Sequence, residues 1–401
     1  MPESLLVHRL DRQINQAVSN VSTDGTLSRP VCPDDLSRQV FGVMGLPLDA
    51  LDLPVLLKTV SAAVDAKAPF LLSTPNVNFL MMSRSDAAFR ESLLQSDLCA
   101  VDGMPLIWIA RLMGIPIKTR LSGSDIFDAL RSRKQTGRQF NVFLFGGAES
   151  IAETVAQKMN AEPDGMKCVG TLNPGFGSVE DMSSDHILQT INASDADLLT
   201  VFLSARKAQG WLLLNHDRVQ VPVRAQFGTT INLQAGKIKR APVLWQRLGF
   251  EWLWRIKEEP YLWRRYWNDG GQLLKLLVTR VMPLSIGGLW RRLVGPLQQE
   301  QLRIDLRRDQ EAVRVKLTGA AVLQHVDLAV SCFRNALDEK KNVLVDVTDT
   351  RQIDARFFGL FLMVRKRLIG QGRRLDFQGM TPHVTKMFRL NGFEFLLNSE
   401  H

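Results

Sequence analysis

Short apolar runs alternate with longer stretches of helical apolar spacing from Val40 onwards. The stretch 151–160 is typical of the helical segments, and the apolar runs that predict strands lie at 69–73, 141–145, 198–203 and 219–225. Strands that alternate with helices in this way predict a parallel sheet covered by helices on both faces. Side chains that follow the carboxyl ends of those strands are therefore the first candidates for binding or catalysis.

The pattern from about residue 302 predicts a second, separate α/β unit. Strand-like runs at 302–306 and 312–317 precede a helical stretch at 327–339 and a buried strand at 342–347. Another helix, a strand at 374–378 and a last helical piece complete the order β-β-α-β-α-β-α. This order fits a compact domain of about a hundred residues. The linker before it is marked by Gly287, Gly288, Gly295 and Pro296.

A basic, tryptophan-rich segment lies between these two units. Residues 237–292 hold twelve Lys or Arg and four acidic residues, a net charge of +8, whereas the whole chain carries +9. Six of the eight tryptophans lie there, and the spacing of Trp245, Leu248, Trp252 and Ile256 predicts one apolar helix face. Clustered positive charge suits an anionic partner. Because a Trp-rich amphipathic face suits lipid better than nucleic acid, we expect no nucleic-acid partner.

The sequence therefore divides into four parts. Residues 1–38 have no sustained periodicity and predict a partly disordered extension. The α/β domain follows at 39–236, the basic appendage at 237–292 and the C-terminal domain at 302–398. The composition, 45% apolar and 23% charged, is ordinary for a globular protein and argues against a disordered or coiled-coil chain.

The location of the protein is predicted from its cysteines and its apolar stretches. Four scattered cysteines without a CxxC spacing fit a reducing compartment. The first residues carry charges where a signal peptide has an apolar core. The most apolar stretch, 273–290, is interrupted by Lys275, Arg280 and Pro283, so it lacks the ~18 unbroken apolar residues of a spanning helix. We expect a protein that is cytoplasmic or attached to a membrane from one side.

Two polar loops that follow apolar runs are candidates for chemistry. The loop Thr74-Pro75-Asn76-Val77-Asn78 leaves two Asn side chains at the end of the first strand, although a plain turn explains it better when taken alone. Asp102-Gly103 follows the stretch 98–101 and places a carboxylate beside a glycine, where a general base would stand. A helix cap for the segment that begins at Pro105 explains Asp102 equally well.

Three further segments are candidates for phosphate or nucleotide binding. Arg120 precedes Asp125 across a glycine turn, so it either holds a phosphate with nearby backbone N–H groups or is the surface partner of an Asp125 helix cap. Gly146-Gly147 follows a strand but lacks the full GxGxxG pattern. The segment 173–177 is either a loop over a nucleotide or a turn. Motifs of metal hydrolases, P-loop enzymes and serine hydrolases are absent from the sequence, so neither a metal nor a cofactor is expected.

Taken in order, these elements resemble the WecG/TagA/CpsF glycosyltransferases (glycosyltransferase family 26) from about Gly42 to Trp267. The matching motifs are Thr74-Pro75-Asn76, Asp102-Gly103, Arg120-x-x-Gly123-x-Asp125, Gly146-Gly147, Ala235-Gly236-Lys-Ile-Lys-Arg240-Ala241-Pro242, Gly249-Phe250-Glu251-Trp252-Leu253-Trp254-Arg255, Glu259-Pro260 and Arg264-Arg265. The resemblance implies a Rossmann-like parallel sheet of the GT-E type with a helical appendage. It also implies an inverting, metal-independent transfer of a sugar from a nucleotide donor, such as a UDP-linked hexose or N-acetylhexosamine, to a polyprenyl-diphosphate-linked acceptor.

The resemblance implies a role for each matching residue. Asp102 is the general base that deprotonates the acceptor hydroxyl, and the diphosphate and the lipid are bound by Arg240, Arg255, Arg264 and Arg265. The substrate and donor contacts are Thr74, Asn76, Asn78, Gly103, Arg120, Asp125, Gly146, Gly147, Gln209 and Asn232. The implied setting is bacterial surface-polysaccharide synthesis, at the inner face of the cell membrane.

Two stretches depart from the family pattern. The usual Gly-x-Pro-Lys-Gln-Glu-x-Trp reads Ser204-Ala205-Arg206-Lys207-Ala208-Gln209-Gly210-Trp211, and a later Asp is replaced by Asn232. Both changes remove carboxylates from the donor side. They motivate a second hypothesis, a weakened transferase that serves as a scaffold or regulator of polysaccharide assembly. We favour an active enzyme because Asp102 and the Arg-rich tail remain.

The C-terminal block resembles a STAS domain. Val343-Leu-Val-Asp346-Val and Ile353-Asp354-Ala-Arg-Phe-Phe-Gly359-Leu360 follow the family's strand and its Ile-Asp-Ser-Ser-Gly-Leu-Gly motif. Arg356 replaces the phosphorylatable Ser of that motif, with Ala355 before it, so phosphorylation at this position is chemically impossible. The resemblance implies docking to a protein partner or self-association.

Overall fold

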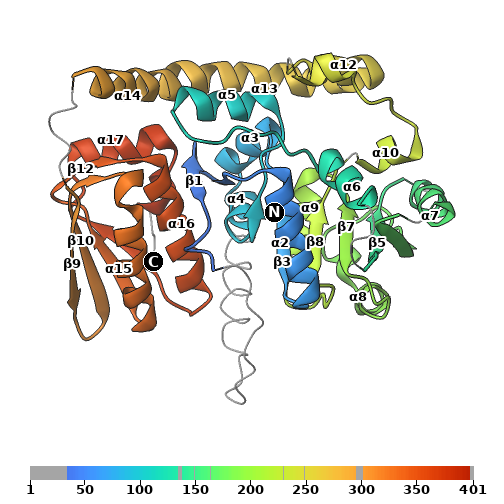
Figure 1. The fold of residues 1–401 in the computed structure, drawn as a ribbon, viewed down its shortest axis with the longest axis horizontal. Helices are drawn as coiled ribbons and strands as arrows, with labels where there is room; N and C mark the ends of the chain where they lie inside the picture. The colour runs from blue at the N-terminus through green and yellow to red at the C-terminus, as the bar shows by residue number, and fades with distance from the viewer. Residues whose placement is uncertain are drawn as a thin grey trace.

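The computed structural model describes residues 34–397, apart from 134–137, 149, 163, 229, 248 and 295–300. Residues 1–33, most of the predicted N-terminal extension, lie outside the described residues. The described chain forms a six-stranded and a five-stranded β-sheet with their own helices, and a two-stranded hairpin. A row of helices runs across both larger sheets (Figure 1).

The larger sheet has six parallel strands in the order β4-β3-β8-β7-β5-β6. The strands are β3 (Phe70–Ser73), β4 (Leu98–Cys99), β5 (Phe140–Gly146), β6 (Met166–Leu172), β7 (Leu198–Phe202) and β8 (Val223–Gln226). The predicted parallel α/β sheet is confirmed. The apolar run 219–225 contributes a strand only from Val223 onwards, and β6 was not predicted.

Helices cover both faces of this sheet because each central strand is apolar on both sides. Leu72 and Leu144 point into one core, whereas their neighbours Leu71 and Phe143 point into the other. The first core is closed by α2 (Leu53–Asp65), α6 (Gly123–Arg131) and α7 (Ile151–Ala161). The second is closed by α8 (Asp185–Asn192) and α9 (Ala205–Leu214).

A third core lies beyond the β4 edge of the sheet. It joins helices α3 (Val77–Ser85), α4 (Ala87–Leu94) and α5 (Met104–Leu112) to an antiparallel hairpin of β1 (Val40–Val43) and β2 (Leu46–Asp49). The hairpin also reaches the C-terminal domain, because Val40 packs into that domain's core. The hairpin therefore belongs to two cores, and the fourfold division of the chain stays a prediction.

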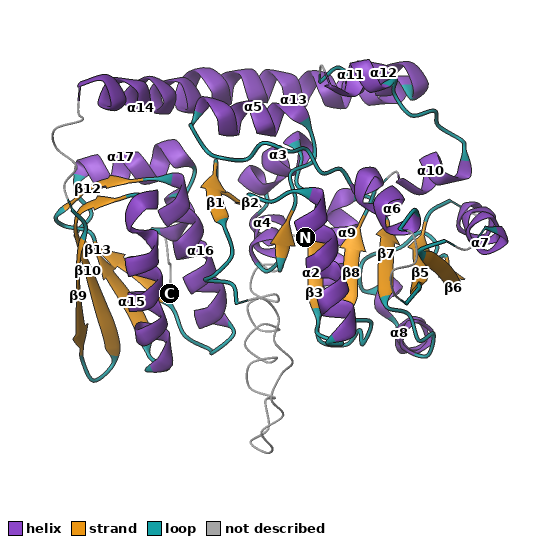
Figure 2. Cartoon of the chain, in the orientation of Figure 1, coloured by secondary structure: helices purple, strands orange, loops and turns teal. Residues whose placement is uncertain are grey.

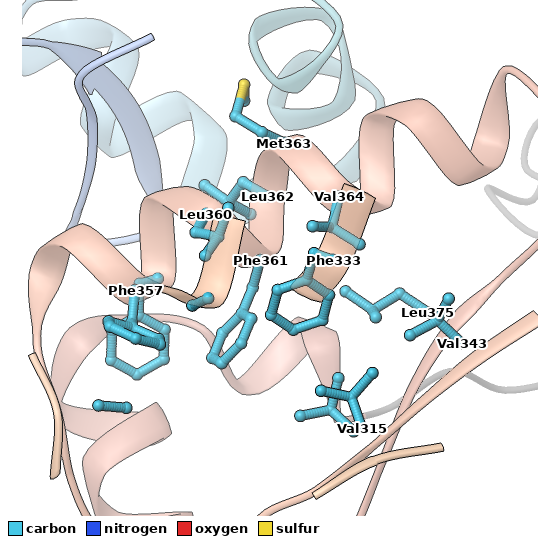
Figure 3. Close-up of a cluster of buried hydrophobic side chains, with 14 of the residues drawn as sticks. Val315, Phe333, Val343, Phe357, Leu360, Phe361, Leu362, Met363, Val364 and Leu375 are labelled. Carbon is cyan, nitrogen blue, oxygen red and sulfur yellow. The ribbon is translucent and has the colours of Figure 1, made fainter. Parts of the chain in front are cut away.

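The smaller sheet follows the predicted C-terminal order, with one added strand. It contains β9 (Arg303–Arg308), β10 (Ala312–Ala321), β11 (Asn342–Asp346), β12 (Thr350–Ile353) and β13 (Leu375–Gln378), in the order β12-β10-β11-β13 with β9 against β10. The sequence pattern missed the short β12. The helices are α15 (Val326–Asp338), α16 (Ala355–Ile369) and α17 (Pro382–Asn391). Phe333, Phe357 and Phe361 fill the core beside Val315 and Val343 (Figure 3).

The basic segment forms a row of helices on one side of the molecule (Figures 1 and 2). After α10 (Thr230–Ala235) come α11 (Val243–Arg247), α12 (Glu251–Glu258), α13 (Trp263–Leu276), a π-helical segment (Leu277–Val281) and α14 (Met282–Val294). The predicted single helix face from Trp245 to Ile256 is wrong, because Gly249 at φ +79° separates α11 from α12. Gly287 and Gly288, predicted as linker, lie inside α14.

Three-ten turns complete the element list: Asp181–Ser183, Pro260–Leu262, Leu323–His325 and Glu394–Leu396. In the part of the chain that the structure describes, one helix, Pro260–Leu289, is long and apolar enough to cross a membrane by length and composition. Only 11% of its most apolar window is buried. The π-helical segment just before Pro283 accommodates the missing proline N–H without breaking the helix. Attachment from one side was predicted because Lys275, Arg280 and Pro283 interrupt the apolar stretch. None of these three residues ends the helix.

Candidate active site

Three loops meet at the carboxyl ends of β3 and β4. The backbone N–H of Asp102 donates to Pro75 O at 2.8 Å, and the N–H of Leu121 donates to Val101 O at 2.8 Å. Asn76 caps α3 by accepting from Phe79 N at 3.2 Å. These bonds fix the positions of the loops after both strands and of the segment that enters α6.

Gly103 lets the chain turn directly after Asp102. It precedes α5 at φ +109°, a conformation that L side chains rarely adopt, and Asn76 lies beside it. Because Gly103 occupies the N-cap position and provides no side-chain cap, Asp102 is not the cap of α5. This removes the structural alternative considered for Asp102.

Asp102 is surrounded by both charge signs. Burial raises the pKa of its carboxyl group to about 7; Arg120 and Arg255 oppose that rise, while Glu251 and Asp125 add to it. A carboxylate with a pKa near neutrality is suited to accept a proton in one step and release it in the next. The arrangement can therefore perform general base chemistry.

An ionic chain connects this carboxylate to the helical appendage. Arg120 donates to Asp125 Oδ2 at 3.0 Å, to Gln246 at 3.3 Å, and to Glu251 of α12. Arg240 donates to Asp125 and, at 2.7 Å, to Asp128. Asp125 also completes a capping box with Ser122, which is the N-cap of α6. The predicted pairing of Arg120 with Asp125 is thus present, but with Asp125 at the third helical position.

The appendage arginines fall into two groups. Arg255 lies close enough to Asp102 for each to shift the pKa of the other; burial lowers the pKa of Arg255, but Tyr266, Asp102 and other acidic neighbours raise it overall. Arg264 and Arg265 are exposed and lie over the rings of Trp263 and Tyr266, at 5.6 and 5.1 Å from the centroids. The first group, with Arg240, faces the site, and the second faces outwards.

Four other predicted donor residues, Thr74, Asn78, Gln209 and Asn232, differ in burial and in their contacts. Gln209 is fully buried and donates to Ser73 Oγ at 3.0 Å, and its part in donor binding stays a prediction. Thr74 is buried, and the Asn78 amide is 3.2 Å from the sulfur of Met82. Asn232 is half-buried on α10.

The glycines after β5 are at the far end of the sheet. Four strand spacings separate β4 from β5, about 19 Å at ~4.8 Å each. A Cβ on Gly147 would lie 3.2 Å from Ile231 of α10, and one on Gly146 would lie 3.1 Å from Phe202 O. Close packing therefore explains why both positions are glycine, and a phosphate site there remains a prediction.

Sequence reasoning gave no role to Glu251 or Gln246, both of which reach Arg120. Glu251 was quoted only as part of a motif, although it is one of four acids among twelve basic residues in its segment. An acid inside such a basic stretch is a usable signal of a specific partner. The described residues contain no group of three or more His, Cys, Asp or Glu placed to hold a metal ion.

The outer surface of the helical row is apolar. Its exposed side chains repeat at helical spacing and, with Trp108 and Leu112 of α5, include Trp263, Trp267, Leu274, Val278, Met282, Ile286 and Leu289. Leu276 and Val281 point the opposite way, into the third core. The row thus presents an apolar stripe with basic residues next to the candidate site.

Comparisons with known proteins agree with this geometry. The model of the glycosyl transferase WecG/TagA/CpsF family matches residues 41–285, and that of the Mlab STAS domain matches residues 304–398. An N-acetylglucosaminyldiphosphoundecaprenol N-acetyl-beta-D-mannosaminyltransferase of Bacillus spizizenii is 24% identical over 200 residues, which cover 50% of this chain and 75% of that protein. A protein of the same name from Bacillus subtilis is 23% identical over 202 residues, 50% of this chain and 77% of its own.

Proposed function

The chain belongs to the WecG/TagA/CpsF glycosyl transferase family, and we propose that it transfers a sugar from a nucleotide-sugar donor to a polyprenyl-diphosphate-linked acceptor. The relatives named above act, by their names, on a diphosphoundecaprenol-linked N-acetylglucosamine and transfer an N-acetylmannosamine. We extend the general kind of reaction to this chain, with a UDP-linked hexose or N-acetylhexosamine as donor.

The observation that carries the proposal is the position of Asp102. Its carboxyl group stands beside the two guanidinium groups of Arg120 and Arg255 and has a pKa raised to about 7. In the proposed reaction it takes the proton of the acceptor hydroxyl, whose oxygen attacks the anomeric carbon as the bond to the donor diphosphate breaks. A single in-line attack inverts the anomeric configuration.

The arginines of the ionic chain would neutralise the leaving diphosphate without a metal. Arg120 and Arg240 are already paired with carboxylates, so a diphosphate would exchange for Asp125 or Glu251 as their partner. Charge-assisted bonds to phosphate oxygens would replace bonds of the same kind. This exchange gives α12 a direct connection to substrate binding.

The apolar stripe supports a location on the membrane, where the lipid-linked acceptor is. Trp and Tyr favour the bilayer interface, and exposed Arg264 and Arg265 suit anionic head groups. We propose that the row of helices lies on the cytoplasmic face of the membrane with its apolar stripe in the lipid. The arrangement would place the Asp102 cluster directly beneath that surface.

The test is a screen for nucleotide release. Purified full-length protein is incubated with UDP- and GDP-sugars and with a lipid-linked acceptor in detergent or vesicles, and the released nucleotide is measured. Release that requires the acceptor supports the transferase. If well-folded protein releases nucleotide from none of the donors, the result supports the scaffold hypothesis. The sequence changes at Ala208 and Gln209 that motivated this hypothesis are weaker support for it, because both residues lie in the core.

A further inference from the structure

The strand that leads to Asp102 is the shortest in its sheet. β4 has two residues and lies at the sheet edge, where it pairs only with β3 through Leu72–Leu98 and Ser73–Cys99. Asp102 follows three residues after its end. A two-residue edge strand has ladder bonds on one side only, so other contacts must hold its outer side.

One buried carboxylate, Asp49, provides such a contact, and a second carboxylate, Asp97, ties the residue before β4 to β3. Asp49, at the end of β2, accepts from the backbone N–H of Cys99 at 2.7 Å. Asp97, directly before β4, accepts from the N–H of Leu71 on β3 at 2.8 Å. Carboxylates held out of water require cations, since an unpaired charge in a protein interior is strongly unfavourable.

The cation for Asp97 comes from the C-terminal domain. Lys366 of α16 donates to Asp97 Oδ1 at 2.7 Å, and also to Ser96 O and Asp35 at 3.3 Å. Its side chain is only 12% exposed. Burial and the Lys366 ammonium act in opposite directions on the pKa of Asp97, and the net effect lowers it.

The cation that pairs with Asp49 is Arg38, and α16 holds the backbone of Arg38 in place. Arg38 binds both oxygens of Asp49, at 3.1 and 2.7 Å. Its backbone carbonyl accepts from Arg356 of α16 at 2.9 Å, and Val40 O accepts from the same guanidinium at 3.0 Å. Arg356 occupies the position at which the STAS motif carries its phosphorylatable Ser, and here it anchors the N-terminal hairpin.

The hairpin and α16 are in direct backbone contact. A Cβ on Gly359 of α16 would lie 2.1 Å from Val40 O, so helix and hairpin touch at the backbone. Phe358 and Phe393 also pack against Gly42 of the hairpin. The helix that carries the STAS motif is therefore buried inside the protein and is not free to dock to another one.

We propose that the STAS domain of this chain is a fixed internal brace for the catalytic strand, and that Lys366 is a positioning residue for Asp102 through Asp97 and β4. The inference rests on the proposed function for the role of Asp102. It replaces the expected docking of α16 to a protein partner with docking to the transferase domain of the same chain.

The test compares Lys366→Met with Arg365→Met in the full-length protein. Arg365 is the matched control because it is the next residue of α16 and pairs with Glu91 of α4, at 3.0 and 2.9 Å, rather than with β4. For Lys366→Met we expect about a tenfold fall in kcat, with KM changed less than about twofold, because a displaced base slows the reaction without weakening substrate binding. Lys366→Arg should restore kcat, and Arg365→Met should leave it unchanged.

Hydrogen exchange provides a readout that does not depend on turnover. The amides of Cys99, Ala100 and Asp102 should exchange faster in Lys366→Met and at the wild-type rate in Arg365→Met. If the wild-type protein transfers no sugar, these rates still test the brace, so its failure and that of the proposed function are distinguishable. Should Lys366→Met not fold, Asp97→Asn/Lys366→Met removes both charges and keeps the acceptor for Leu71. Wild-type kcat and exchange in the folded Lys366 variant, or equal effects of Arg365→Met, would overturn the proposal.

Discussion

At the β4 end of the six-stranded sheet, the loops bring Asp102, Arg120 and Glu251 together beneath α12. At the β5 end, Gly146 and Gly147 are packed against Phe202 and Ile231. Both ends carry glycine at or shortly after the end of a strand, yet only the first gathers charged groups around a carboxyl with a raised pKa. A glycine after a strand indicates a close approach, but only its neighbours decide whether a ligand or another side chain makes that approach.

The largest expected effect that separates the two ends is on turnover. Asp102→Asn removes the proposed base, so kcat should fall about 10²–10⁴-fold while donor affinity stays near the wild-type value. The matched change at the other end is Asp181→Asn, in the segment after β6, where the carboxylate accepts from the backbone N–H of Ser178 at 2.9 Å. It should leave kcat unchanged. Initial rates and donor titrations check both, and unchanged turnover of Asp102→Asn would remove the role of Asp102.

Membrane binding should depend on the side of the molecule that α12 and α13 cover, and not on the opposite side. Reversing Arg264 and Arg265 to Glu should weaken binding to anionic vesicles by about 2 kcal/mol or more, at ~1 kcal/mol for each basic residue near the surface. The control is Arg373→Glu/Arg374→Glu, an exposed pair before β13, at the end of the smaller sheet away from α17 and the helical row. Vesicle sedimentation measures both. Equal sedimentation of the two variants would contradict the proposed membrane side.

At the β5 end we expect a change in stability instead of activity. Gly147 has φ +92° and a Cβ there would press on Ile231, so Gly147→Ala should lower the free energy of unfolding by about 2 kcal/mol. Gly175→Ala, at φ +76° with open space around it, shares the backbone cost without the contact and should lose about 1 kcal/mol. Urea unfolding gives both values. A large loss of donor affinity in Gly147→Ala would instead indicate a phosphate turn.

The smallest effect concerns pH. Since the pKa of Asp102 is about 7, its carboxyl group is protonated at lower pH and cannot act as a base, so kcat/KM should rise with pH and level off above about 7. The Glu251 carboxylate raises the pKa of Asp102, and it also pairs with Arg120, whose positive charge lowers that pKa. Glu251→Gln should therefore lower the pKa of Asp102, and the increase of kcat/KM should move to lower pH. Glu258→Gln on the same helix is the control. Identical pH profiles for wild type and Glu251→Gln would refute the coupling.

Stability should depend on Asp102 in the opposite sense. Its pKa is raised in the folded protein above the ordinary 3.8, so the folded state holds this proton more tightly than the unfolded state. Its ionisation therefore costs stability between about pH 4 and pH 7. Asp102→Asn should flatten that part of the stability profile, measured by urea unfolding at several pH values.

Much of the fold could be predicted from the sequence because strand burial leaves a local signal. Phe70–Leu72 and Val142–Phe145 are apolar at successive positions, on both sides of the strand, as buried parallel strands require. β12 was missed since Thr350–Ile353 has only four residues, three of them polar or charged. The break at Gly249 was missed because apolar spacing continues across it, while the backbone turns at a positive φ.

The candidate site could be predicted only in part. Asp102, Arg120 and Asp125 were found because motif spacing in one loop or helix start is local. The Glu251–Arg120 pair spans 131 residues and depends on how α12 folds back, which no local pattern contains. The full burial of Gln209 behind β3 was not predicted for a related reason: it depends on how α9 packs on the sheet.

The hairpin that two cores share has a consequence for biosynthesis. Arg356 follows its hydrogen-bond partner Val40 by 316 residues. At ~5–20 residues per second the ribosome needs on the order of 15–60 s to deliver α16 after the hairpin. During that interval α16 does not yet cover the apolar side of β1, and chaperones can bind it. A stop codon before α16 would therefore release chains whose transferase half keeps an uncovered apolar edge, and such chains should be cleared or aggregate.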